Sequence, residues 1–305
     1  MELTLGPIAY HWSAEKKRDF YARIADEAPV GTVYLGEVIC SKRAPFFERD
    51  LPEVIARLER AGKTVVLSSL AEVMLKRERE ATAGLASLEH PEIEINNASG
   101  LFARQGRPHR IGPFLNAYNE ATIAWLAGQG ASHVCLPAEM PGEAIAAASR
   151  AAGALGIDVE VQVFGRAPLA VSARCYHARA HGRTKDNCQF VCEDDPDGMP
   201  LSTRDGRAML RVNGIQTQSE SYVELLDELP ALQAMGVSHA RLMPQDVDMV
   251  AVAEAFAACL EGRVEAGEAR ESLRGLCGRT GFSNGFYHGT AGYRRIDRVG
   301  AAVSA

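Results

Sequence analysis

Short apolar runs recur along the chain, and most are followed by a stretch in which apolar residues repeat at helical spacing. A run of about four to eight apolar residues between polar or glycine residues is typical of a buried strand. The expected strands are residues 3–9, 32–35, 64–67, 93–95, 111–115, 133–136, 159–164, 208–212 and 240–243. The expected helices are residues 14–28, 51–61, 71–88, 120–127, 141–155, the amphipathic segment 222–235, and 247–261.

This alternation of strands and helices predicts a parallel sheet covered by helices. Roughly eight strand–helix units favour a closed barrel over an open dinucleotide-binding sheet, and no Gly-x-Gly-x-x-Gly follows the first strand. We therefore predict an α/β fold, a TIM-like (β/α)8 barrel over residues 1–262. Residues 263–305 contain many Gly and Arg residues and an aromatic cluster, and we expect them to form a C-terminal extension packed over one end of the barrel.

Polar side chains follow several of the expected strands. In a (β/α)8 barrel the carboxyl ends of the strands meet on one face, where the chemistry of the fold takes place. Four of these residues are our candidates for binding a substrate: Glu37, Asn116, Asn119 and Arg166. A polar residue after a strand is often only the cap of the next helix, and Asn96 and Asn97 fit that role better than a site role.

Composition narrows the class of protein. The 305 residues are 47% hydrophobic and 24% charged, which is ordinary for a globular domain. The net charge of -6 argues against nonspecific binding of nucleic acid. No apolar run approaches the roughly 18–20 residues that a membrane span needs. No signal peptide is recognisable at the N-terminus, so we expect a cytoplasmic protein without a transmembrane segment.

Cysteines gather in one polar segment, residues 174–192, which contains Cys175, Cys188 and Cys192 among several Arg, Lys and His residues. Cys40 lies far upstream in a similar setting, followed by Ser41, Lys42 and Arg43. Apolar periodicity is missing from the segment, so these thiols do not serve to fill a core. In a reducing cytosol, clustered cysteines indicate metal ligands better than disulfides. We predict that the four cysteines bind one metal centre, with an iron–sulfur cluster as the first choice.

Other interpretations of the cysteines remain open. Zinc is the runner-up, because Cys188 and Cys192 could form a closed tetrahedral site with His177 or His181. A redox-active thiol pair is less favoured, since the chain has no Cys-x-x-Cys. The remaining cysteines are expected to be small buried hydrophobic residues; they are Cys135, Cys259 and Cys277.

Several segments of the sequence resemble a known family. They are Leu5-Gly6-Pro7, residues 34–43 around Cys40, residues 115–119 around Asn116, residues 172–175 and residues 210–217. These segments resemble the UbiV family of the collagenase-like peptidase superfamily, and the resemblance extends over nearly the whole chain. The motif around Cys40 is its most discriminating part.

The resemblance implies a cofactor, partners and a pathway. It implies a four-iron four-sulfur cluster on Cys40, Cys175, Cys188 and Cys192. It also implies a heterodimer with a UbiU-like subunit, association with a UbiT-like lipid-binding protein, and a quinone precursor as the small-molecule substrate. The chain would then support the oxygen-independent hydroxylation of a ubiquinone precursor under anaerobic conditions, as a component of an oxidoreductase.

Alternative functions come from other classes. The chain could be a non-catalytic scaffold subunit whose metal centre only stabilises the cysteine segment, or it could take part in RNA base hydroxylation as sister families do. The acidic net charge counts against RNA. Peptidase activity is not expected, because the sequence has neither a Gly-x-Ser-x-Gly elbow nor a His-Glu-x-x-His zinc motif.

Overall fold

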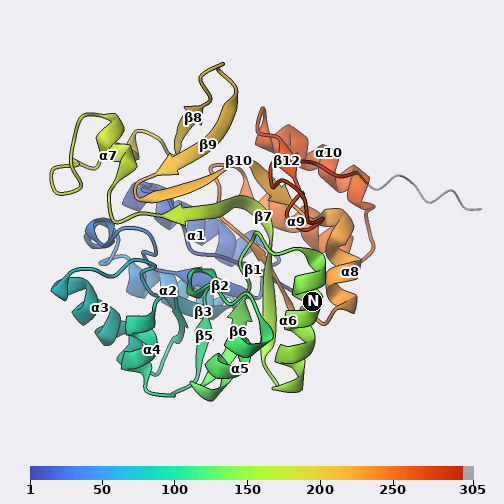
Figure 1. Cartoon of the computed structure of the whole chain (residues 1–305), viewed down its shortest axis with the longest axis horizontal. Coiled ribbons are helices and arrows are strands. Elements are labelled where there is room, and N and C mark those ends of the chain that lie inside the picture. The colour runs from blue at the N-terminus through green and yellow to red at the C-terminus, as the bar shows by residue number, and fades with distance from the viewer. Residues whose placement is uncertain (298–305) are drawn as a thin grey trace, which may run out of the picture.

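Eight parallel strands close into a barrel in the computed structural model, which describes residues 1–297 (Figure 1). Neighbouring strands pair in parallel, and β11 closes the ring by pairing with both β1 and β7. The barrel strands are β1 (Glu2–Leu5), β2 (Thr32–Leu35), β3 (Thr64–Ser68), β4 (Glu92–Ile95), β5 (His109–Ile111), β6 (Ala131–Cys135), β7 (Asp158–Val171) and β11 (His239–Leu242). The prediction of a (β/α)8 barrel is confirmed.

Helices follow the barrel strands and form the outer layer. They are α1 (Ala14–Glu27), α2 (Leu51–Arg60), α3 (Lys76–Ser87), α4 (Ala98–Arg104), α5 (Glu120–Gly128), α6 (Gly142–Ala154), α8 (Leu229–Ala234) and α9 (Met249–Leu260). Local chemistry sets several of their starts. Ser13 caps α1 by accepting a backbone N–H at 3.2 Å, and Asn97 and Asn119 cap α4 and α5 in the same way.

The two faces of the barrel strands differ in chemistry. Outward side chains such as Val33, Ile93 and Leu242 join the large apolar core between strands and helices. The intervening side chains point into the barrel, and many of them are polar: Thr4, Tyr34, Glu94, Arg110, His133, Glu160 and Arg241. The apolar core therefore lies outside the barrel, while a hydrogen-bonded network fills its interior.

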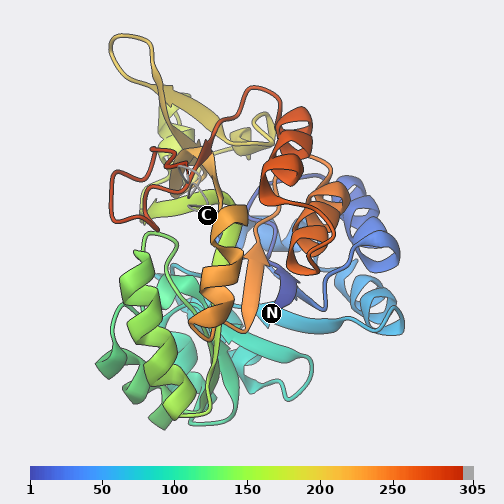
Figure 2. The same ribbon diagram turned by 90° about the vertical axis from the view of Figure 1, so that its right-hand side faces the viewer.

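A long insertion separates β7 from α8. Strand β7 continues beyond the barrel, and its far half pairs in antiparallel fashion with β10 (Gln216–Glu224). Strands β9 (Ala208–Asn213) and β8 (Met199–Ser202) extend this outer sheet as a hairpin that projects from the body of the molecule (Figures 1 and 2). The short helix α7 (Tyr176–Ala180) and the cysteine segment precede this hairpin.

The C-terminal region adds one helix to the outer helical layer and one short strand beside β10. Helix α10 (Ala266–Cys277) packs beside α9, as Figure 2 shows in orange and red, and the two-residue strand β12 (Phe282–Ser283) pairs with β10. Within the expected extension 263–305, residues 298–305 lie outside the described residues. In the part of the chain that is described, no helix combines the length and apolar character that crossing a bilayer requires.

Several expected elements differ from the structure: the strand expected over 3–9 ends at Leu5, and the strand expected over 159–164 continues to Val171. The helix expected over 71–88 begins only at Lys76, because the Ala71 N–H donates to the Val38 carbonyl at 2.8 Å and Glu78 accepts the N–H of Leu75 at 2.9 Å. The strand expected over 111–115 ends at Ile111, since Pro113 starts the 3-10 helix η2 (Pro113–Leu115).

The largest difference lies in the segment 222–235. The amphipathic segment 222–235 was expected to be one helix, but its first residues complete β10 as far as Glu224. A 3-10 turn, η4 (Leu226–Glu228), and α8 with Pro230 in its first turn follow. Pairing of β10 with the extension of β7 overrides the helical spacing of the segment.

Candidate metal centre

Two segments of the chain meet at the carboxyl end of the barrel. The first follows β2 and contains Cys40, directly before the 3-10 helix η1 (Ser41–Phe46). The carboxylate of Glu37 accepts the backbone N–H groups of Ile39 and Cys40 at 3.0 and 2.9 Å. These two hydrogen bonds fix the backbone of the turn on which Cys40 lies.

The second segment belongs to the insertion after β7. Cys175 caps α7, and its Sγ accepts a backbone N–H from the first turn of that helix at 3.4 Å. Cys188 and Cys192 flank a tight turn in which Gln189 and Phe190 have left-handed backbone conformations, with φ of 49° and 52°. This turn, continued by the 3-10 helix η3 (Val191–Glu193), keeps the two thiols close in space.

The four predicted cysteines lie in one neighbourhood. Electrostatic interactions connect Cys175 with Cys40 and Cys188. They also connect Cys192 with Cys175 and Cys188. Cys175 and Cys188 belong to one small apolar cluster at the end of the barrel. That the four bind a metal stays a prediction. The other cysteines lie elsewhere: Cys135 in β6, Cys259 in α9 and Cys277 in α10.

Arg43 is the buried cation of this neighbourhood. Its side chain is fully enclosed, and it donates to the Ala9 carbonyl and to Asn213 Oδ1, both at 3.0 Å. Its positive charge also interacts electrostatically with Cys192 and Cys40. The Nε atom of Arg43 has no hydrogen-bond partner among the described residues. A positive charge held at this place offsets the charge of an anionic thiolate centre.

Burial has the largest effect on the pKa of three of the thiols. It raises the pKa of Cys40, Cys175 and Cys192, and the charge of Arg43 partly opposes this rise in all three. Cysteine binds metals as thiolate, so a metal that binds here must displace protons. The donor set consists of soft sulfur atoms beside a fixed cation, which is the chemistry that iron–sulfur and zinc centres require.

Sulfur spacing distinguishes these two kinds of centre. Four thiolates on one zinc ion lie about 3.8 Å apart, given Zn–S bonds of about 2.3 Å in a tetrahedron. Among residues 1–297, no three of the four cysteine sulfurs lie within 4.8 Å of one another. The four sulfurs are therefore farther apart in this structure than the ligands of a single zinc ion. A cluster of several metal ions is larger than one ion, so its ligands lie farther apart.

The histidines of the segment have other partners. His177 is fully buried; its Nε2 lies 2.8 Å from Asp195 Oδ2, and its Nδ1 lies 3.5 Å from the Gly214 N–H. His181 Nδ1 lies 3.0 Å from the His177 carbonyl. Both ring nitrogens of His177 are engaged, so this residue does not offer a free ligand to a zinc site with Cys188 and Cys192.

Lysine 42 joins the two segments. The Lys42 ammonium donates to the carbonyls of Lys185 and Asp186 at 2.8 and 3.1 Å and lies 3.6 Å from Cys188 Sγ. It also lies over the ring of Phe190, 5.7 Å from the centroid. One side chain thus links the turn after β2 to the turn that carries Cys188 and Cys192.

The four substrate candidates do not meet in one pocket. Glu37 is occupied by the turn at Cys40, and it lines a separate pocket of about 160 Å³. Asn119 is exposed and serves as the cap of α5. Arg166 is buried and ion-paired with Asp197, although it lines a small cavity of about 20 Å³ at the mouth of the barrel.

Asn116 is the candidate that faces a larger pocket. This pocket, of about 340 Å³, lies over the carboxyl ends of β5, β6 and β7 and is also lined by Glu72, Tyr118 and Glu139. Its volume falls in the range of about 300–1,000 Å³ that is usual for small-molecule sites. Three of its lining residues also pack against the apolar cluster of Cys175 and Cys188; they are Ala71, Phe114 and Val171. The pocket therefore adjoins the cysteines.

The polar network inside the barrel was not among the features predicted from the sequence. Glu160 is fully buried and accepts hydrogen bonds from Thr4, Tyr34 and Arg241. Arg241 also donates to Glu94 at 2.6 Å. The sequence carries a signal for it, because each of these charged residues stands between apolar residues of a short strand. In a strand, the side chain of such a charged residue points to the opposite face of the sheet from the side chains before and after it.

The chain matches one family model and is also similar to solved structures. The family model described as "Peptidase family U32" matches residues 12–297, a range that includes all four cysteines of the candidate centre. Among solved structures, the chain is similar to a chain of the tryptophan synthase complex from Pyrococcus furiosus. The two are 12% identical with a TM-score of 0.42, over 90% of this chain and 97% of that one.

Proposed function

This chain belongs to peptidase family U32, and we propose that it acts as an iron–sulfur subunit rather than as a peptidase. The proposed ligands are Cys40, Cys175, Cys188 and Cys192. We further propose that it supports the oxygen-independent hydroxylation of a ubiquinone precursor in the cytoplasm, as the resemblance to the UbiV family implies. In this role it would be part of an oxidoreductase that includes a UbiU-like subunit.

The observation that carries the proposal is the meeting of four thiols from two distant segments beside one buried arginine. Thiols that only fill space need no cation, but Arg43 interacts electrostatically with both Cys192 and Cys40. Enclosing a guanidinium costs several kcal/mol unless it is compensated by charge and hydrogen bonds. An anionic centre at the thiols would supply that compensation.

Iron–sulfur is favoured over zinc by two features. The sulfurs are spaced more widely than one zinc ion requires, as described above. Both ring nitrogens of His177 are engaged, so of the two histidines only His181 could complete a mixed site. When bound, a four-iron four-sulfur cluster supplies one-electron transfer.

The adjoining pocket supports a small-molecule substrate. It is open at the mouth of the barrel and lined by both polar and apolar residues, among them Asn116, Tyr118 and Phe114. Such a lining suits a hydroxylated aromatic ring. Asn116 and Tyr118 would bind and orient the ring, while Phe114 separates the pocket from the apolar cluster around Cys175.

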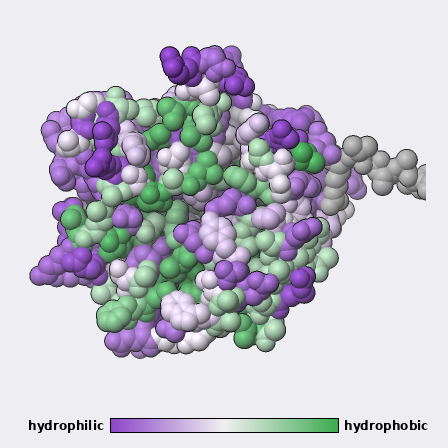
Figure 3. All heavy atoms as spheres, in the orientation of Figure 1, coloured by the Kyte–Doolittle hydropathy of each residue, from purple (hydrophilic) through white to green (hydrophobic). Residues whose placement is uncertain are grey.

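Exposed apolar side chains on the insertion support a protein partner. Tyr176, Leu201 and Met209 are large apolar residues that are 43–54% exposed. Figure 3 shows hydrophilic side chains over the tip of the β8–β9 hairpin and apolar side chains lower on the same face, between hairpin and barrel. We propose that this face contacts the UbiU-like subunit. A UbiT-like lipid-binding protein would deliver the apolar precursor.

The first test measures the metal. The full chain is purified without oxygen, and iron, sulfide and zinc are measured in the wild type, in Cys40→Ala and in the control Cys259→Ala. We expect about four iron and four sulfide per chain in the wild type and in the control. Cys40→Ala should lose most of both. A colourless wild-type protein that holds one zinc ion contradicts the proposal.

The second test separates catalysis from a scaffold role. Cys40→Ala and Cys259→Ala are each co-purified with a UbiU-like partner, and anaerobic formation of the hydroxylated quinone is measured. We expect Cys40→Ala to keep its helical circular dichroism but to lose hydroxylation, whereas Cys259→Ala keeps both. Hydroxylation at the wild-type rate by cluster-free Cys40→Ala would instead support the scaffold alternative.

A further inference from the structure

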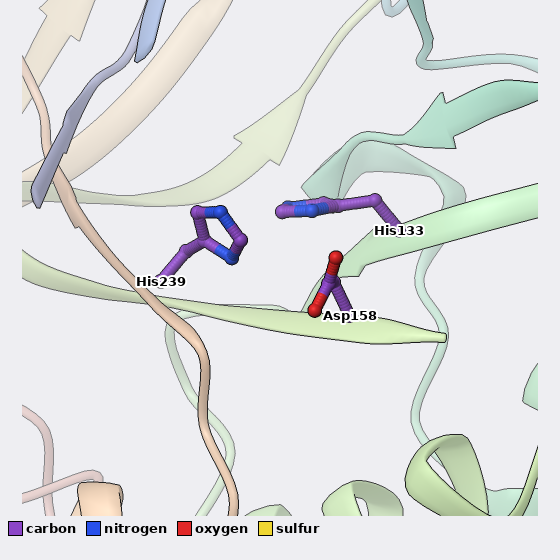
Figure 4. A group of neighbouring side chains, drawn as sticks. All are labelled: His133, Asp158 and His239. Carbon is purple, nitrogen blue, oxygen red and sulfur yellow. The ribbon is translucent and has the colours of Figure 1, made fainter. Parts of the chain in front are cut away.

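A second cluster of metal-ligating side chains lies at the other end of the barrel. Asp158 and His239 are the first residues of β7 and β11, and His133 lies in the middle of the neighbouring strand β6, paired with Asp158. Their side chains converge inside the barrel (Figure 4). One ligand atom from each residue lies within 4.8 Å of the other two, and no second group of three His, Cys, Asp or Glu within residues 1–297 meets this distance.

The hydrogen bonds of His133 leave one of its ring nitrogens free to bind. Its Nε2 lies 3.1 Å from Glu160 Oε2, and this buried carboxylate is ion-paired with Arg241. An ionised carboxylate only accepts hydrogen bonds, so Nε2 carries the proton. Nδ1 of His133 therefore has a lone pair.

The same reasoning applies to His239. Ser238 Oγ donates its single proton to the Val159 carbonyl at 3.0 Å and accepts the Val159 N–H at 3.1 Å. The hydroxyl also lies 2.8 Å from His239 Nδ1, so this ring nitrogen is already engaged. With the proton of the neutral ring on Nδ1, Nε2 of His239 offers its lone pair to a metal.

We propose that His133, Asp158 and His239 bind a divalent transition-metal ion, with Zn²⁺ as the first choice. Two imidazole lone pairs and a carboxylate form a three-ligand set that suits Zn²⁺ or Fe²⁺ better than Mg²⁺ or Ca²⁺. Glu160 and Ser238 hold the two rings in the required tautomers, as groups behind metal ligands commonly do. Water would complete the coordination.

The position of the site indicates its role. In (β/α)8 barrels the chemistry takes place at the carboxyl ends of the strands, whereas the amino ends serve stability. The three ligands join β6 to β7 and β7 to β11, and the chain leaves the barrel for its long insertion between β7 and β11. The ion would therefore hold the barrel closed at this seam. It is independent of the cysteine centre, which lies at the opposite end.

The test uses Co²⁺ as a spectroscopic probe and Zn²⁺ as the stabilising ion. Both are titrated into the full chain in four forms: wild type, Asp158→Asn, His239→Gln and the control His90→Gln, whose ring is on the surface. Each form is also examined with Cys188→Ala, which impairs the cysteine centre. Asp158 is exposed, so its substitution leaves the apolar core intact.

We expect one equivalent of Co²⁺ that lacks the charge-transfer band of thiolate ligation and persists in Cys188→Ala. Binding should weaken at least about tenfold in Asp158→Asn and His239→Gln but not in His90→Gln. Zn²⁺ should raise the Tm of the wild type and not that of Asp158→Asn. Equal affinity in wild type and both site variants, or wild-type binding weaker than about 1 mM, overturns the inference. Neither result bears on the cysteine centre.

Discussion

His11 shows how the surroundings of the cysteine segment change the chemistry of a single residue. It is 3% exposed, and its ring lies 5.1 Å from that of Phe46 and 5.5 Å from that of Phe190. Neither ring nitrogen has a hydrogen-bond partner among the described residues. Burial, with the charges of Arg43 and Lys17, lowers its pKa to about 4. The folded state therefore holds this histidine neutral.

This lowered pKa makes stability depend on pH. Because the unfolded chain has the ordinary histidine pKa of about 6.5, protonation favours unfolding. The contribution of His11 is complete above about pH 6.5 and is lost as the pH falls toward 4. Between pH 7 and pH 5 the wild type should lose about 2 kcal/mol more unfolding free energy than His11→Phe. Urea unfolding at both pH values measures this, and parallel losses in the two proteins contradict it.

At the scale of elements, the turn between β9 and β10 completes the cysteine neighbourhood. Gly214 in this turn has φ of 62°, and a Cβ built there would lie 2.6 Å from Nη2 of Arg43. Asn213 precedes it and accepts from the same guanidinium. A hairpin whose Asn213 is 170 positions away in the chain thus positions the arginine beside the thiols.

A substitution in this turn tests that role. Gly214→Ala should destabilise the fold by about 1–3 kcal/mol more than Gly206→Ala, because the added methyl group displaces Arg43. Gly206, in the turn between β8 and β9, is the matched control: its φ is 81°, but a Cβ there meets nothing within 4 Å. We also expect lower iron retention in Gly214→Ala only. Urea unfolding and iron content measure both effects, and equal values for the two variants would count against the role.

Elements differ in how far the sequence predicts them. Strands such as β2 and β3 are short apolar runs with polar ends, so their positions follow from the local pattern. The segment that became the end of β10 has helical spacing, and only its pairing with the distant end of β7 decides its structure. The cysteines were recognisable by residue type and setting. The site formed by His133, Asp158 and His239 was not recognisable from the sequence. Its residues are far apart along the chain and become neighbours only through the register of the strands.

Substrate candidates show the same limit. Asn119 and Glu37 follow strands as site residues do, but the structure uses one as a helix cap and the other to fix a turn. Residue type and position at a strand end cannot separate these uses from substrate binding. Arg166 was predicted as a candidate from its position alone, whereas its ion pair with Asp197 depends on the folding of the insertion.

At the scale of the whole molecule, the most demanding feature of the fold is the network of buried charged side chains inside the barrel. Arg241 is 1% exposed and pairs with both Glu94 and Glu160, which are equally enclosed. These residues come from β4, β7 and β11, so the network connects opposite sides of the ring. Each buried charge depends on the others for compensation.

Removal of the central cation should therefore affect the whole barrel. Arg241→Met leaves two buried carboxylates without their partner and should cost about 3–5 kcal/mol of unfolding free energy. Arg23→Met removes an arginine of the exposed ion pairs with Glu27 and Asp248 and should cost about 0–1 kcal/mol. Urea unfolding of both variants gives the comparison. Similar losses in the two would mean that the interior network contributes no more than a surface pair.

The split of the thiols between Cys40 and the later segment 174–192 has a consequence for biosynthesis. Chains emerge from the ribosome with the N-terminus first, at about 5–20 residues per second. Cys40 therefore leaves the ribosome well before Cys175, Cys188 and Cys192. Strand β11, which closes the barrel, emerges later still. Any metal that all four thiols share can be bound only after residue 192 has been made. Until then, Cys40 is a free thiol that lacks the other three ligands.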